Sequence, residues 1–253
     1  MKNRTSISDY DRYKTVCKNA YENEESFRIF KQNLDYKVIL EHVSFEQGDR
    51  FIDRTLENNN INYDYINKFK ENDIYGTPDL FTYRHPFGLI SPSTLRYVKV
   101  LSDLIKFFGS LDNMSIVEIG VGYGGQAKII MDYFNIKEYN FIDLPEVCSL
   151  TKKYLSKFNY SNCNFLDFEN LPDRKYDLVI SNYAITECTM EIQNLYIDKV
   201  LKNSTKGYMI GNKISHLFNI NSYSKEDWQQ IMPNITIHEE VPATAEGNYL
   251  MIF

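Results

Sequence analysis

The sequence predicts an α/β fold, in which a mostly parallel sheet is covered by helices on both faces and follows a helical N-terminal region. From Met114 onward, short apolar runs alternate with amphipathic helical patterns, as in sheets whose parallel strands are joined by helices. No such alternation occurs before Asn72, where apolar residues recur at helical spacing. The last two apolar runs are joined by a connection too short for a helix, so we expect the final strand to be antiparallel.

The first region, residues 1–90, is expected to contain helices followed by a loop. Phe27, Phe30, Leu34 and Val38 recur at helical spacing and predict one buried helical face. The segment from Tyr75 to Ser93 is expected to be a loop because it holds five residues that interrupt regular structure: Gly76, Pro78, Pro86, Gly88 and Pro92. Long loops are often functional, and we expect this region to close over the functional site of the second region.

The second region, residues 91–253, opens on a helix with clear boundaries. Ser91 is expected to be its N-cap, Pro92 its first residue and Gly109 its end. The strands that we expect after it are Ser115–Ile119, Tyr139–Ile142, Asn164–Leu166, Asp177–Ser181 and Tyr208–Gly211, followed by Ile235–Glu240 and Asn248–Phe253. The helices between them are expected at Gln126–Phe134, Val147–Phe158 and Ile192–Val200.

Composition and charge exclude several classes of function. The 34 acidic residues outnumber the 28 basic ones, and the net charge of -6 argues against binding of nucleic acid. No run of 18 apolar residues predicts a membrane span, and the polar start MKNRTSISDYDRY does not predict a signal peptide. The 4 cysteines are scattered without a CxxC pair. These features predict a cytoplasmic protein that does not interact with membranes.

A glycine-rich turn ends the first strand of the expected sheet. Gly120, Gly122 and Gly124 lie between that strand and a helix, where glycine permits positive φ and close approach of a ligand to the backbone. Together with Gly125, the first two also satisfy the G-x-G-x-x-G pattern of dinucleotide sites. Glu118 argues against a nicotinamide cofactor, because a carboxylate at the strand tip favours a ligand with an ammonium group.

Two acidic residues follow the next two strands. Asp143 stands where an acid accepts hydrogen bonds from ribose hydroxyls, although it also fits an N-cap of the helix that begins at Pro145. Asp167 is placed to accept a hydrogen bond from an adenine amino group, with Phe168 beside the ring. Its alternative interpretation is a solvated loop acid.

These motifs together resemble the Rossmann-like S-adenosylmethionine-dependent methyltransferases. The similarity rests on E-x-G-x-G-x-G at residues 118–124, on Asp143 and Asp167, and on YDLVISN at residues 176–182. The segments STLRY at residues 93–97 and SNYA at residues 181–184 are more narrowly similar to bacterial sugar O-methyltransferases. The resemblance implies that S-adenosylmethionine is bound by residues of these motifs: Glu118, Gly120, Gly122, Tyr123, Gly124, Asp143, Leu144, Asp167, Phe168, Ser181 and Asn182.

Methyl transfer to a hydroxyl benefits from a base that removes the proton. Glu187 follows the fourth strand and is the first candidate, although an acid there also suits a helix N-terminus. His216 follows the fifth strand and is the second candidate. The residues expected to bind the acceptor are Tyr83, Arg84, His85, Tyr183 and Asn212, and the arginines Arg84 and Arg96 suit a diphosphate. No pair of histidines has metal-ligand spacing, so no metal site is expected.

The resulting hypothesis is an enzyme that methylates a hydroxyl of a sugar. The sugar is expected to be free or nucleotide-linked and destined for a capsular or lipopolysaccharide surface polymer. The alternative within the class is a methyltransferase for the oxygen or nitrogen of a non-sugar metabolite or of a phosphorus-linked group. A nicotinamide-dependent oxidoreductase and a non-catalytic cofactor-binding protein are the alternatives outside it. A homodimer is the one protein assembly that we expect.

Overall fold

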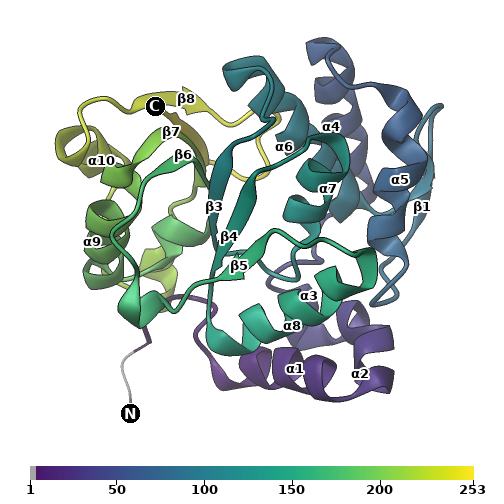
Figure 1. Cartoon of the computed structure of the whole chain (residues 1–253), viewed down its shortest axis with the longest axis horizontal. Coiled ribbons are helices and arrows are strands. Elements are labelled where there is room, and N and C mark those ends of the chain that lie inside the picture. Colours follow the sequence, from purple (N-terminus) through teal and green to yellow (C-terminus); the bar gives the residue numbers. More distant parts are fainter. Residues whose placement is uncertain (1–3) are drawn as a thin grey trace.

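The computed structural model describes residues 4–253, and these form a central sheet of seven strands flanked by helices (Figure 1). The strand order is β5-β4-β3-β6-β7-β9-β8. β9 alone runs in the direction opposite to the other six strands. The strands are β3 (Ser115–Ile119), β4 (Glu138–Ile142), β5 (Cys163–Phe165), β6 (Tyr176–Asn182), β7 (Ser204–Gly211), β8 (Thr236–Glu239) and β9 (Tyr249–Ile252). The predicted fold class, a mostly parallel sheet with an antiparallel last strand, flanked by helices and preceded by N-terminal helices, is confirmed.

Alternate residues of each strand supply the two hydrophobic cores on either side of the sheet. In β3, Ile116 packs on one side, whereas Val117 and Ile119 pack on the other. Figure 1 shows α6, α7 and α8 along one side and α9 and α10 along the other. The bounds of these helices are α6 (Pro92–Phe108), α7 (Gly125–Tyr133), α8 (Pro145–Leu155), α9 (Met190–Lys199) and α10 (Lys225–Ile231).

Helix α6 has the boundaries that its sequence predicts. The Ser91 side chain accepts a hydrogen bond from the backbone N–H of Thr94, and Pro92 occupies the first turn. The helix stops at Gly109, whose φ is 74°. Since α6 packs directly on α7, these caps fix a helix that stands beside the glycine turn.

The N-terminal helices pack onto the sheet domain and share a hydrophobic core with it. Helix α1 lies along α8, and α4 lies along α6. Phe51, Ile52 and Phe69 from this region belong to the same buried cluster as Val98 and Leu101 of α6. The region contains α1 (Asp11–Glu22), α2 (Glu24–Ile29), α3 (Leu34–Lys37), α4 (Phe45–Asn58) and α5 (Ile66–Lys70). The division at residue 90 therefore remains a prediction, and it does not separate two cores.

Short 3-10 helices join or extend the main elements. They are η1 (Phe30–Gln32), η2 (Tyr63–Tyr65), η3 (Glu71–Asp73), η4 (Ser156–Phe158), η5 (Phe168–Asn170), η6 (Ala184–Glu187), η7 (Leu201–Asn203) and η8 (Ile214–Phe218). Three of them follow strands at the carboxyl edge of the sheet: η5 comes after β5, η6 after β6 and η8 after β7. They therefore lie where open parallel sheets bind ligands.

The single helical face expected between Phe27 and Val38 is wrong in its second half. Phe27 and Phe30 are buried, whereas Leu34 is 78% and Val38 64% exposed. The chain breaks at Asn33, whose side chain accepts a hydrogen bond from the N–H of Asp35 and starts a new helix. This break changes the direction in which the later side chains point.

The expected loop from Tyr75 to Ser93 contains a short antiparallel hairpin. Its strands are β1 (Phe81–Tyr83) and β2 (Gly88–Ile90), which pair with each other and not with the main sheet. The Tyr83 ring stacks on Phe45 of α4 with ring centroids 4.8 Å apart. Gly76 and Pro78 precede the hairpin, Pro86 lies in its turn, and Gly88 begins β2, so these residues do not prevent the two short strands from forming.

We expect Ile52→Ala to lower the free energy of unfolding by about 2–5 kcal/mol, because it leaves a cavity between α4 and α6. Ile52 is fully buried in the shared core. Urea denaturation followed by circular dichroism measures the change. Leu34→Ala is the matched control, since Leu34 is 78% exposed and its truncation leaves no cavity. Equal destabilisation by both variants would contradict a shared core.

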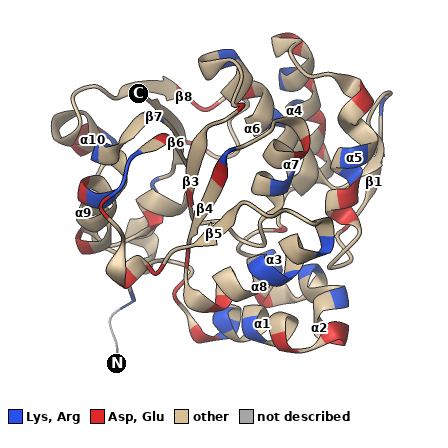
Figure 2. Ribbon diagram, viewed as in Figure 1, with Lys and Arg blue, Asp and Glu red and all other residues tan. Residues whose placement is uncertain are grey.

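Acidic and basic side chains are interspersed over the molecule (Figure 2). Several form ion pairs that join elements distant in sequence, such as Lys153 of α8 with Glu24 of α2 at 2.9 Å. In the described part of the chain, no helix has both the length and the apolar character needed to cross a membrane.

Candidate active site

A cavity of about 690 Å³ lies at the carboxyl ends of the central strands. Its floor comes from the ends of β3, β4 and β6 and the segments that follow them. Its walls come from the N-terminal segment, from residues 38–51, from the start of α6 and from the connection between β8 and β9. Ten of the residues predicted for the site line it: Glu118, Gly120, Gly122, Asp143, Leu144, Phe168, Asn182, Tyr183, Glu187 and Asn212.

The glycine turn is held by Asp143. One carboxylate oxygen, Oδ2, accepts hydrogen bonds from the N–H groups of Val121 at 2.8 Å and Gly122 at 3.2 Å. The other, Oδ1, accepts from the N–H of Leu144 at 2.7 Å. Burial raises the pKa of Asp143 to about 6, although these hydrogen bonds oppose the shift. The N-cap position of α8 belongs to Leu144, so the alternative role of Asp143 as that cap is wrong.

Glu118 places a second carboxyl group on the cavity wall. Its side chain is 2% exposed, and the Tyr139 hydroxyl donates a hydrogen bond to Oε2 at 2.6 Å. Burial raises the pKa of Glu118 to about 8, and Asp143 adds to the rise. A bound cation would reverse this shift, because a nearby positive charge stabilises the ionised carboxylate.

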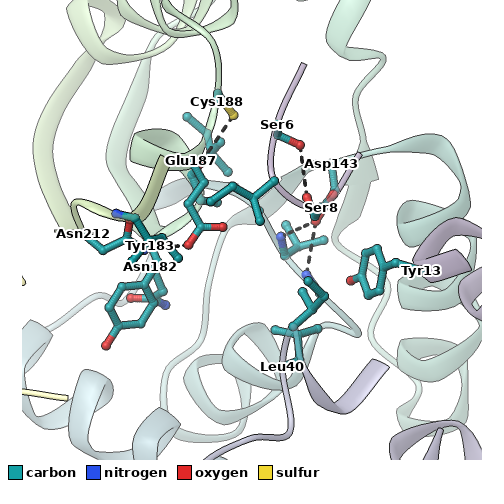
Figure 3. Close-up of a pocket in the computed structure, with 18 of the residues that line it drawn as sticks. Ser6, Ser8, Tyr13, Leu40, Asp143, Asn182, Tyr183, Glu187, Cys188 and Asn212 are labelled. Carbon is teal, nitrogen blue, oxygen red and sulfur yellow. Dashed lines mark hydrogen bonds between the residues drawn. The ribbon is translucent and has the colours of Figure 1, made fainter. Parts of the chain in front are cut away.

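Glu187 lies on another wall of the cavity, at the end of η6 (Figure 3). The Asn212 amide donates a hydrogen bond to Glu187 Oε1 at 2.6 Å and orients the carboxyl group. Burial raises the pKa of Glu187 to about 7, against the lowering effect of that hydrogen bond. A carboxyl group with this pKa suits proton transfer near neutral pH.

Two cavity-lining residues carry buried oxygen atoms that accept no hydrogen bond from the described residues: Asn182 Oδ1 and Gln126 Oε1. Buried polar atoms normally find a partner. Tyr183, the residue after Asn182, has a φ of 69°, a strained conformation for a side chain of this size. An unpaired acceptor, Asn182 Oδ1, and a strained residue, Tyr183, thus lie together at the end of β6, as expected for a ligand site, whereas Gln126 lies at the start of α7.

Residues 5–8 cover part of the cavity, as expected for the N-terminal region as a whole, although nothing in the sequence singled out this segment. The Ile7 N–H donates to the Glu187 carbonyl at 3.1 Å, and the Thr189 N–H donates to the Thr5 carbonyl at 2.8 Å. Figure 3 shows Ser6 and Ser8 on the side of Asp143. This short polar segment has no pattern that predicts such a role. Of the described N-terminal region, residues between 4 and 13 and between 38 and 51 line the cavity.

The hairpin residues predicted to bind the acceptor lie outside the cavity, which corrects that expectation. Tyr83 packs on α4, and its hydroxyl donates to the Phe45 carbonyl. Arg84 is exposed and forms ion pairs with Asp49 and Asp53. His85 is exposed in the turn of the hairpin. The hairpin packs against α4 because its apolar side chains are buried there, and this carries its polar residues away from the sheet edge.

Five other predicted residues also lie outside the cavity lining. His216 is exposed on η8, and Asp167 is exposed and accepts a hydrogen bond from the N–H of Glu169 in η5. Gly124 faces Thr151 of α8. The Tyr123 hydroxyl accepts a hydrogen bond from Asn72, and the Ser181 hydroxyl accepts one from the Ile185 N–H. The side chains of Tyr123 and Ser181 are fully buried, and they support the glycine turn and the end of β6 from the side away from the cavity.

Among residues 4–253, no group of three or more histidine, cysteine, aspartate or glutamate side chains is arranged to hold a metal ion. The 4 cysteines are free thiols. Burial raises the pKa of Cys148 to about 12, so its sulfur stays protonated at neutral pH. The cavity lining holds the carboxyl groups of Glu118, Asp143 and Glu187, the guanidinium groups of Arg4 and Arg96, and the imidazole of His42.

No family model matches the chain. An alignment of 113 positions, which covers 40% of the chain, gives 29% identity to the non-reducing polyketide synthase mapC of Penicillium brevicompactum. The chain spans only 4% of the length of that protein. Two solved structures are similar over 62% of this chain at 15% identity, and both contain S-adenosylhomocysteine. The first is the N-methyltransferase NodS of Bradyrhizobium japonicum, of which the alignment covers 83% with a TM-score of 0.49. The second is the magnesium protoporphyrin IX methyltransferase ChlM of Synechocystis, of which the alignment covers 80% with a TM-score of 0.47.

Proposed function

We propose that the chain is an S-adenosylmethionine-dependent methyltransferase that acts on a hydroxyl group of a small molecule. One observation carries the proposal: Glu118 and Asp143 flank the glycine turn while Glu187, with a pKa of about 7, lines the same cavity. The first two carboxyl groups suit a ligand with an ammonium group and a ribose. The third suits removal of a proton from an acceptor.

The residues of the cavity fit the cofactor at several points. Glu118 is placed for its ammonium group, and Asp143 for its ribose hydroxyls, because a carboxylate can accept further hydrogen bonds beside those from the turn. The unpaired oxygen of Asn182 or of Gln126 is available to an additional donor. Phe168 lines the cavity and offers an aromatic face. When bound, the cofactor supplies an activated methyl group on a sulfonium sulfur.

The protein then has to align the acceptor, exclude water and accept a proton. Glu187 takes the hydroxyl proton on its carboxylate as the oxygen becomes nucleophilic, and Asn212 keeps the carboxylate oriented. Residues 5–8 lie over the cavity and restrict the entry of water. In this scheme His216 has no part, because it lies outside the cavity.

The acceptor is a sugar hydroxyl if the resemblance of residues 93–97 and 181–184 to sugar O-methyltransferases extends to the substrate. A nucleotide-linked sugar for a surface polysaccharide is the corresponding specific proposal. The second candidate is a non-sugar metabolite, and it is favoured by the apolar side chains that line the cavity while exposed to solvent: Val38, Ile214 and Phe218. Such a rim suits an acceptor with an apolar part.

Calorimetry with S-adenosylhomocysteine, NAD and NADP tests the proposal. We expect only the first to bind, and to bind more tightly as the pH rises from about 6 to about 8, because Glu118 must lose its proton to pair with the ammonium group. Glu118→Gln should abolish most of this pH dependence, whereas the exposed Glu191→Gln should retain it. Binding of NAD in place of S-adenosylhomocysteine would overturn the assignment.

A further inference from the structure

The glycine turn needs support from other elements, because a glycine lies on each side of Tyr123. Gly122 and Gly124 have φ values of 54° and 90°, and glycine restricts the backbone less than any other residue. A rotation at either position would redirect the N–H of Gly122, which donates to Asp143 at 3.2 Å. Tyr123 is fully buried against the start of α7, since a Cβ on Gly125 would lie 2.6 Å from Tyr123 Cζ. The Tyr123 side chain is thus the part of the turn that other elements can hold.

Asn72 of η3 holds Tyr123 from the N-terminal region. Its Nδ2 donates hydrogen bonds to the hydroxyl groups of Tyr123 at 3.0 Å and Thr94 at 2.8 Å. Its Oδ1 accepts a hydrogen bond from the Tyr154 hydroxyl at 2.5 Å. The fully buried amide thus uses both of its N–H groups and its oxygen. Through this single side chain, the turn is joined to α6 and to α8.

Lys31 of η1 joins Asn72 and Tyr123 a second time. Its ammonium group donates to the Asn72 backbone carbonyl at 3.0 Å and lies 4.0 Å from the centre of the Tyr123 ring. Lys31 is fully buried, and the attraction between a cation and a ring is stronger where water is excluded. On the other side, the Thr151 hydroxyl of α8 donates to the Gly122 carbonyl at 2.7 Å. The sheet domain therefore holds Gly122, and the N-terminal region holds Tyr123.

We propose that Asn72 is a positioning residue for the cofactor, because its hydrogen bond to Tyr123 fixes the glycine turn in the conformation that binds S-adenosylmethionine. The inference rests on the proposed methyltransferase function. Asn72 is not part of the cavity lining, so it acts on a bound ligand only through the turn. Loss of the hydrogen bond lets the two glycines beside Tyr123 adopt other conformations, and this weakens cofactor binding.

Calorimetry with S-adenosylhomocysteine on the full chain tests the proposal at a temperature where every variant is folded. We expect Asn72→Ala and Tyr123→Phe each to lower the affinity by at least about fivefold, which corresponds to about 1 kcal/mol for one hydrogen bond. The double variant should bind about as tightly as the weaker-binding single variant, because both substitutions remove the same hydrogen bond. Thermal unfolding without ligand measures the stability of each variant independently of binding.

Asn60→Ala is the matched control. The Asn60 amide also joins the N-terminal region to α6, since it donates to the Ser102 carbonyl at 2.9 Å and accepts from the Ser102 hydroxyl at 2.8 Å. Asn60 is not part of the cavity lining, and none of its side-chain hydrogen bonds goes to the glycine turn. Asn60→Ala should therefore lower the melting temperature and leave the affinity for S-adenosylhomocysteine unchanged. A merely structural Asn72 would give the same result.

Three results would overturn the proposal. The first is an unchanged affinity in Asn72→Ala or in Tyr123→Phe. If Asn72→Ala does not fold, Tyr123→Phe alone decides, because it removes one oxygen atom and keeps the ring. The second is an additive loss in the double variant, which would show that Asn72 acts without Tyr123. The third is an equal loss of affinity in Asn60→Ala. Failure of the wild-type chain to bind S-adenosylhomocysteine would instead overturn the methyltransferase function itself.

Discussion

Glu187→Gln is expected to lower kcat by at least about a hundredfold with the affinity for S-adenosylhomocysteine unchanged, because the amide keeps the shape of the side chain but cannot accept the proton. In the wild-type enzyme, kcat should rise with pH through about 7, since Glu187 is protonated and inactive below its pKa and ionised above it. The variant should lack this dependence. Initial rates measured across that pH range with saturating substrates provide the comparison.

Three further variants separate catalysis from structural effects. Asn212→Ala removes the hydrogen bond that lowers the pKa of Glu187, so the rise of kcat should move to higher pH. His216→Asn changes an exposed residue outside the cavity and should leave kcat near normal. Glu191→Gln removes an exposed acid near the start of α9 and should also have little effect. A Glu187→Gln enzyme with a normal kcat and pH profile would show that another group accepts the proton.

Gly122→Val is expected to abolish cofactor binding. Gly122 has a φ of 54°, which a β-branched residue adopts only with strain of about 1–3 kcal/mol. Its added Cβ would lie 2.8 Å from a methyl carbon of Leu40, so the turn or the cavity wall must shift. That shift would disrupt the hydrogen bond from the Gly122 N–H to Asp143. Calorimetry with S-adenosylhomocysteine measures the loss.

Gly109→Val is the matched control for this substitution. Gly109 also has positive φ, at 74°, but a Cβ there would have no other atom within 4 Å, and the residue lies at the end of α6 outside the cavity. Both variants should therefore lose stability through backbone strain, whereas only Gly122→Val should lose the cofactor. Thermal unfolding of each variant without ligand establishes that the chain is folded. Normal affinity in a folded Gly122→Val variant would contradict the assignment of the turn.

The local sequence predicted features that depend on neighbouring residues and on strand patterning. Ser91 and Pro92 mark the start of α6 because a cap acts within one helical turn. Buried parallel strands are apolar throughout, so the runs before Gly120 and before Asp143 could be recognised without tertiary contacts. The antiparallel direction of the final strand, β9, could be predicted because the connection before it is too short to contain a helix. These signals also placed Glu118, Asp143 and Glu187 at the carboxyl edge of the sheet.

The sequence by itself thus determined the sheet, the glycine turn and the acids at strand ends, because each depends on residues close together in the chain. Only the tertiary structure decided which of two similar arginines reaches the cavity: Arg84 pairs with acids on α4, whereas Arg96 is buried in the cavity wall. The tertiary structure also places Ile7 beside Glu187, although most of the chain separates these two residues in sequence. Such choices depend on how α4, the hairpin and the N-terminal segment pack on the sheet, and the packing of distant apolar surfaces leaves no local pattern from which a side chain's direction can be predicted.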